Sequence, residues 1–138
     1  MKEMVIDAKR ENLPSVLAFV DEQLEAAECP MLTQTSIDVA VEEVFVNIAS
    51  YAYDTETGTV VVQVTVLKDP LSVEITFIDN GNPYDPLAKK DPDVTLPREK
   101  RKKGGLGIFM VKKTMDDVTY EYKDGKNILT IKKKLNEE

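Results

Sequence analysis

The chain has 138 residues, of which 42% are hydrophobic and 31% are charged, as is typical of one soluble globular domain. Its net charge of −7 provides no overall positive field for nucleic acid, so direct binding of DNA or RNA is not expected. The absence of histidine excludes a Ser-His-Asp triad, a His-ligated zinc site and a phosphohistidine on this chain.

The single cysteine, Cys29, excludes an intrachain disulfide. No apolar stretch has the length of a membrane span, and the N-terminal residues lack the apolar core of a signal peptide. These features predict a cytoplasmic protein without membrane contact.

The first half of the chain predicts a short strand followed by two amphipathic helices. The strand is expected over Met4–Ala8. Apolar residues at helical spacing predict the first helix over Leu13–Ala27, with Asn12 as its N-cap and Pro30 as its terminator. The second helix, over Thr33–Tyr51, matches the helical template at every apolar position.

The second half predicts two strand pairs separated by a long loop and a short helix. Thr59–Leu67 and Leu71–Ile78 form the first pair, joined by a turn at Asp69-Pro70. The loop at about 80–103 has the length of a lid or binding loop. The last elements are expected over Ile108–Met115, Val118–Tyr122 and Ile128–Lys134. This order predicts an α+β fold, a two-layer sandwich whose helices cover one face of a mixed, mostly antiparallel sheet.

Glu43 and Asn47 on the second predicted helix are the first candidate site residues. Four residues advance a helix about 40° beyond a full turn, so the two side chains share a face at the border of the apolar stripe. An Asn carbonyl oxygen suits a hard cation such as Mg²⁺, and a neighbouring carboxylate can accept a proton. Glu42 is out of register with Asn47 and is the weaker candidate for a base. Taken alone, the pair fits a solvated helix edge better than a site.

The second candidate is the run Asp79-Asn80-Gly81-Asn82-Pro83, directly after a predicted strand. A carboxylate at a strand end can accept a hydrogen bond from an exocyclic amine such as that of adenine, and Gly81 allows a ring to approach the backbone closely. The same residue types are the commonest in turns, so this run alone does not establish a site.

The third candidate is an anion site at the start of the last predicted helix. Residues 98–103 carry five positive charges and one negative charge, and they lead into Gly104-Gly105-Leu106-Gly107. Free N–H groups at a helix N-terminus bind anions, and nearby Lys and Arg add positive charge. A solvated charge run explains these residues equally well. The spacing matches neither the Walker nor the Rossmann pattern.

Together the three motifs form one specific arrangement, which resembles the N, G1 and G2 boxes of the ATPase superfamily of gyrase, the heat-shock chaperones, histidine kinases and mismatch-repair ATPases. Within it, the chain is most similar to the anti-sigma-factor serine/threonine kinases. The resembling segments are AVEEVFVNIASYAY at 40–53, DNGNPYDP at 79–86 and GGLGIFMVKKTMDDVTY at 104–120. The element order extends the resemblance over nearly the whole chain, which implies a single Bergerat-type ATP-binding domain over 1–138.

The resemblance implies a role for each motif residue. Asn47 would bind the Mg²⁺ that bridges the phosphates of ATP, and Glu43 would act as general base toward an incoming hydroxyl. Asp79 would bind the adenine amine, with Gly81 below the ring. The implied phosphate-binding residues, next to an ATP lid at about 80–103, are Lys103, Gly104, Gly105, Leu106 and Gly107.

The resemblance also implies a reaction and protein partners, and the sequence departs from the family pattern at two positions. The implied reaction is Mg-ATP-dependent phosphorylation of a serine or threonine on a small anti-anti-sigma protein, by a kinase that sequesters a sigma factor according to the ATP/ADP ratio. A homodimer is a further family-level expectation. Tyr51 stands where relatives commonly carry histidine, and Asn127 stands where threonine is common.

Three alternatives remain open at this point. A non-catalytic ATP-binding module would use nucleotide to shape the lid for a protein partner, but such a module has no evident need for Glu43. A histidine-kinase catalytic domain is less favoured, because the sequence has no histidine, membrane segment or preceding dimerisation helix. An α/β domain without a nucleotide site does not explain three ordered motifs.

Overall fold

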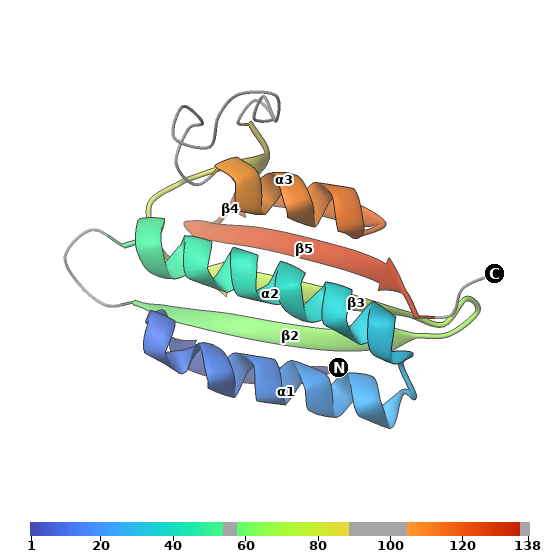
Figure 1. Cartoon of the computed structure of the whole chain (residues 1–138). Helices are drawn as coiled ribbons and strands as arrows, with labels where there is room; N and C mark the ends of the chain where they lie inside the picture. The colour runs from blue at the N-terminus through green and yellow to red at the C-terminus, as the bar shows by residue number, and fades with distance from the viewer. Residues whose placement is uncertain (54–57, 89–104, 136–138) are drawn as a thin grey trace.

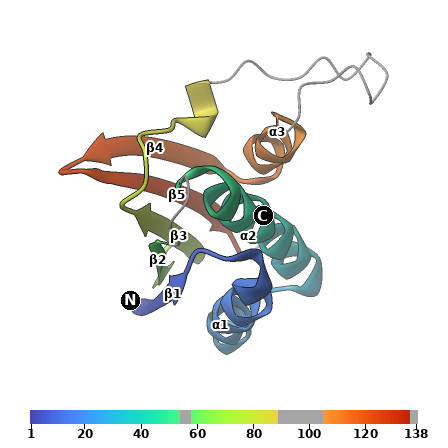
Figure 2. The same cartoon turned by 90° about the vertical axis from the view of Figure 1, so that its left-hand side faces the viewer.

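A computed structural model describes residues 1–53, 58–88 and 105–135 of the chain. In this part, helices lie side by side on one face of a five-stranded sheet (Figures 1 and 2). The helices are α1 (Leu13–Ala26), α2 (Met31–Tyr51) and α3 (Gly105–Thr114), with short 3-10 turns η1 (Arg10–Asn12) and η2 (Pro86–Ala88). The strands are β1 (Lys2–Asp7), β2 (Thr59–Leu67), β3 (Ser72–Asp79), β4 (Asp117–Lys123) and β5 (Lys126–Lys134).

The strands are arranged in the order β1-β2-β3-β5-β4, and each neighbouring pair is antiparallel. The predicted two-layer α+β sandwich is therefore confirmed. Its sheet was expected to be mixed and mostly antiparallel, and in the described strands it is antiparallel throughout. None of the helices in the described ranges combines the length and the apolar character that a membrane span requires.

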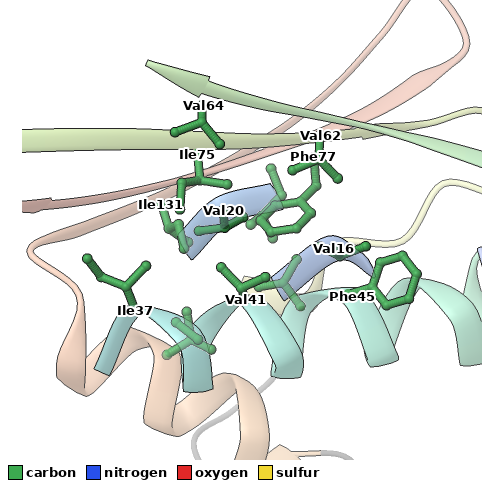
Figure 3. Packing of buried hydrophobic residues seen from close by; sticks show 14 of the residues in the cluster. Val16, Val20, Ile37, Val41, Phe45, Val62, Val64, Ile75, Phe77 and Ile131 are labelled. Atoms are coloured by element: carbon green, nitrogen blue, oxygen red, sulfur yellow. The ribbon is translucent and has the colours of Figure 1, made fainter. Parts of the chain in front are cut away.

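The core lies between the helices and the inner face of the sheet (Figure 3). Alternation along the strands turns every second side chain toward α2, where Val41 and Phe45 are fully buried. Burying one such side chain contributes about 1.5–3 kcal/mol. Inward residues of the three central strands are Val60, Val62, Val64, Val73, Ile75, Phe77, Leu129 and Ile131. At one end of β3 and β5 this apolar series gives way to two buried polar residues, Asp79 and Asn127.

Helix α1 ends at Ala26, four residues before the expected terminator Pro30. The chain turns at Glu28, whose φ of 58° lies in the left-handed region, and the Cys29 N–H donates to the Leu24 carbonyl at 3.0 Å. This bond closes the end of the helix. Pro30 then occupies the N-cap position of α2.

The capping of α1 and the start of α3 also differ from expectation. Asn12 does precede α1, but its side chain donates to the Asp7 carbonyl at 3.0 Å and does not cap the helix. Helix α3 begins at Gly105, three residues before the expected Ile108. Glycine costs about 1 kcal/mol in a helix relative to alanine, so packing of α3 against α2 overrides a local preference here. Of the predicted lid, residues 80–88 are described and include η2; the remainder lies outside the described residues.

Two carboxyl groups meet between α1 and α2 and give the fold a pH dependence. Burial, a hydrogen bond with Asp21, and the charges of Asp21 and Glu25 raise the pKa of the Asp38 carboxyl to about 7. The unfolded chain releases this proton near pH 4, so stability falls as the pH rises from about 4 to about 7. We expect Asp38→Asn to raise stability at pH 8 by about 1 kcal/mol, since the group is partly exposed.

Urea unfolding of the wild type and Asp38→Asn at pH 5 and pH 8 measures this effect. The gain should be clearly larger at pH 8 than at pH 5. The exposed Asp117 provides the control, because Asp117→Asn changes the same charge without removing a carboxyl pair. An equal gain in both variants would show that net charge is responsible and not the pair.

Candidate functional site

A pocket lies between α2, the ends of β3 and β5, and the first residues after β3. Its walls are mainly apolar, and its polar side chains include Asn47 and the buried pair Asp79 and Asn127. The apolar lining residues include Val44, Ile48, Phe77, Ile108 and Leu129. A concave apolar site with a few convergent polar groups is suited to a flat organic ring that carries a hydrogen-bonding edge.

Asp79 provides the acceptor in this pocket. Its side chain is only 4% exposed, and its Oδ1 accepts hydrogen bonds from the Gly81 N–H and from Asn127 Nδ2, both at 2.9 Å. Burial raises the pKa of the Asp79 carboxyl, and these two hydrogen bonds partly oppose the rise. Within the described residues both bonds end on Oδ1, which leaves Oδ2 for a ligand donor.

Gly81 lies directly against the end of α2. A Cβ atom at this position would come within 2.1 Å of the Ala52 carbonyl oxygen, and the Asn82 N–H donates to the same oxygen at 2.7 Å. The glycine therefore permits a close backbone approach that any side chain would prevent. Its expected place below a bound ring stays a prediction.

A second pocket adjoins the first and shares Asn47 and Ile108 with it. Glu43 and Gly107 also line it, so the two Glu-x-x-x-Asn residues meet the start of α3 at one site. A Cβ on Gly107 would lie 2.1 Å from Glu43 Oε2. Glu42, in contrast, is exposed and does not line the pocket. The arrangement agrees with the expected register of Glu43 with Asn47.

The Glu43 carboxylate lies in surroundings that favour its protonated form. Partial burial raises its pKa, and the negative charge of Glu42 adds to the rise. A carboxylate made more basic in this way is a better proton acceptor near neutral pH.

The remaining predicted phosphate-binding residues are placed only in part. Gly105 and Leu106 form the first turn of α3, next to Gly107. Lys103 and Gly104 lie outside the described residues.

Arg10 is a pocket residue that motif analysis missed. It lines the second pocket from η1, and its Nη2 donates to Ser50 Oγ at 2.8 Å. Ser50 lies seven residues after Glu43 on α2 and shares its face, a relation that helical spacing could have indicated. No local pattern identifies Arg10, because forty residues separate it from its partner.

Two tyrosines, Tyr84 and Tyr120, line the first pocket together with Asn127. The period-2 pattern of the last strand places Asn127 on the same face as the buried Leu129, and a polar residue at such a position is a signal. Tyr51 also reaches this region, with its ring centroid 5.9 Å from that of Tyr84.

Comparisons with a family model and with known proteins point to the same family. The model of the histidine kinase-like ATPase domain matches residues 6–133. The chain is 31% identical over 101 residues to the serine-protein kinase RsbW of Listeria monocytogenes, covering 70% of this chain and 63% of the relative. It is 29% identical over 98 residues to RsbW of Bacillus cereus, covering 68% and 60%. The chain thus spans somewhat less than two thirds of the length of these relatives.

Solved structures show the same fold at low sequence identity. The RsbU and RsbW domains of a Mycobacterium tuberculosis protein match with a TM-score of 0.67 at 17% identity, over 100% of this chain and 34% of that one. The histidine kinase domain of a blue-light-activated kinase from Erythrobacter litoralis matches with a TM-score of 0.54 at 19% identity, over 77% and 46%.

Proposed function

Because this chain belongs to the histidine kinase-like ATPase domain family, we propose that it binds Mg-ATP and transfers the γ-phosphoryl group to a serine or threonine of a small protein partner. The observation that carries the proposal is the meeting of Glu43, Asn47 and Gly107 at one pocket beside the Asp79 pocket. The similarity to RsbW kinases supports a regulatory role, as an anti-sigma factor whose substrate is an anti-anti-sigma protein. A cytoplasmic location and a homodimer remain predictions.

The adenine ring is proposed to occupy the first pocket. Its exocyclic amine would donate to Asp79 Oδ2, because the hydrogen bonds from Gly81 and Asn127 both end on Oδ1. The apolar walls would contact the two faces of the ring. Asn47 lines both pockets, so the triphosphate would run from the first pocket past Asn47 into the second.

The residues of the second pocket fit a magnesium ion that is held chiefly by phosphate oxygens. In the described ranges no group of three His, Cys, Asp or Glu side chains could hold a metal by itself. Mg²⁺ does not need such a cage, since it commonly binds through one or two protein oxygens, the substrate phosphates and water. The Asn47 side-chain oxygen would be the protein ligand, and the ion would supply neutralising charge at the β- and γ-phosphates.

Glu43 is proposed to act as the general base. As the acceptor hydroxyl oxygen bonds to the γ-phosphorus, its proton passes to the Glu43 carboxylate, and the bond from that phosphorus to the bridging oxygen of ADP breaks. Phosphoryl transfer depends mainly on positioning and charge neutralisation. One partly buried carboxylate, that of Glu43, is therefore sufficient as the base.

Arg10 is proposed to contribute positive charge at the phosphates. A guanidinium has five N–H donors, of which the bond to Ser50 uses one, and the rest suit phosphate oxygens. We expect Arg10→Gln to lower the transfer rate about 10- to 100-fold with little change in the unfolding midpoint. The neighbouring exposed Lys9 gives the control variant Lys9→Gln, which removes the same charge outside the pocket. Equal rates in the two variants would contradict this role.

Transfer of label from γ-³²P-ATP to the anti-anti-sigma protein of the same organism tests the reaction. The proposal expects a phosphoester, stable to acid, on a serine or threonine of that protein. Nucleotide binding without any labelled product would instead favour the non-catalytic ATP-binding module.

A further inference from the structure

We propose that Asn127 is a positioning residue for base recognition, which orients Asp79 and anchors the first residues after β3 around it. The inference rests on the proposed nucleotide site and adds the determinant of its base preference. Asp79 and Asn127 are directly opposed in the register of β3 and β5. Their Cβ atoms are therefore about 4.5–5.5 Å apart on the helix-covered face of the sheet. The next residues on the same face of the two strands, Phe77 and Leu129, are apolar, so Asp79 and Asn127 are a buried polar pair beside apolar residues.

The Asn127 amide nitrogen binds acceptors on two elements. It donates to Asp79 Oδ1 at 2.9 Å and to the Asn82 carbonyl at 2.9 Å, with the Gly81 carbonyl more distant at 3.4 Å. One side chain thus connects the end of β3 to the loop that follows it. Both amide hydrogens are used in these contacts.

The Asn127 amide oxygen is also engaged. It accepts from the Tyr84 backbone N–H at 3.2 Å and from the Tyr120 hydroxyl. A backbone N–H can only donate and carbonyl groups can only accept, so the partners fix which end of the amide is oxygen. Because all its donors and acceptors are used within the protein, Asn127 leaves no group for a base. It acts through Asp79.

Two consequences follow for Asp79. The Asn127 bond holds Oδ1 toward β5, which leaves Oδ2 directed to the ligand. The same bond opposes the rise that burial causes in the pKa of Asp79, so it helps to keep the carboxylate charged. Without it, Asp79 is expected to rotate more freely and to take up a proton at higher pH.

The preference for Mg-ADP over Mg-inosine diphosphate measures this role. The two nucleotides differ at C6, where the amine donor of ADP is replaced by a carbonyl acceptor, and at the adjacent N1, which is an acceptor in adenine and carries a hydrogen in inosine. The isosteric variant Asn127→Leu should reduce the ratio of the two affinities about tenfold, the effect of one well-oriented charged hydrogen bond. The pH below which ADP binding weakens should also move upward in this variant. A purely structural role would weaken both nucleotides equally.

Thr130→Val is the matched control. It removes a hydrogen bond of 3.0 Å to Thr76 between the same two strands, on the opposite face of the sheet, and should preserve the preference.

If Asn127→Leu does not fold, Tyr120→Phe removes a single partner of Asn127, and we expect the preference to fall roughly two- to threefold. An unchanged ratio in the folded variants overturns the inference. A wild type that binds neither nucleotide, or both equally, contradicts the proposed adenine site itself.

Discussion

Replacing Glu43 by glutamine is expected to lower phosphoryl transfer to the protein partner by about 10²–10⁴-fold, the usual contribution of a positioned general base. Glutamine keeps the size and shape of the side chain but cannot take up the hydroxyl proton. Since the pocket contact with Gly107 is retained, the affinity for Mg-ADP should stay within about threefold of wild type. Single-turnover transfer from γ-³²P-ATP, combined with calorimetric titration of Mg-ADP, separates the two effects.

The adjacent Glu42 provides the matched control for this experiment. Glu42→Gln removes the same charge one residue away, on an exposed position outside the pocket. It should leave transfer within about threefold of wild type. Equal rates for Glu43→Gln and the wild type would rule out Glu43 as the base, and strong loss in both variants would assign the effect to charge and not to position.

Asp79→Asn is expected to weaken Mg-ADP binding about 100-fold, a cost of roughly 2–3 kcal/mol. The Gly81 N–H must face an acceptor, so the amide oxygen of the substituted side chain would take the place of Oδ1. The amide nitrogen of that side chain would then point toward the ligand and present a donor to the donor amine of adenine. Such a mismatch leaves two buried polar groups unpaired, which accounts for the size of the loss.

The same geometry predicts a partial reversal of base preference. The Asp79→Asn variant should bind Mg-inosine diphosphate at least as well as Mg-ADP, because the inosine carbonyl can accept from the new amide. The unliganded variant should not be less stable than the wild type at neutral pH, since burial of the charged Asp79 is itself unfavourable. Calorimetric titrations and unfolding midpoints of both proteins measure these effects. Undiminished ADP affinity would exclude Asp79 as the base-reading group.

Much of the fold follows from periodicity in the sequence. The apolar spacing of α2 and the alternation in β2 and β3 predict these elements to within two residues, because one face of each is buried. Boundaries set by tertiary contact could not be predicted in the same way. Helix α3 begins at Gly105 because it packs on α2, although local propensity favours a later start.

The candidate site was predictable where a motif is local. Glu43 and Asn47 share a helix, and Asp79 and Gly81 share a turn, so spacing alone brings each pair together. Arg10 could not be found in this way, because its proximity to Ser50 depends on how η1 meets α2. The Asn127 network similarly depends on β5 lying between β3 and β4, a strand order that local patterns do not specify.

The most direct test of an adenine nucleotide site is the unfolding midpoint of nucleotide-free protein with and without Mg-ADP. At about 100 times the dissociation constant, binding stabilises the folded state by roughly 2.7 kcal/mol. For a chain of 138 residues this corresponds to a rise of about 10 °C. We expect that rise in the wild type and its loss in Asp79→Asn at the same concentration. An unchanged midpoint in the wild type, at every Mg-ADP concentration up to about 10 mM, would contradict the proposed site.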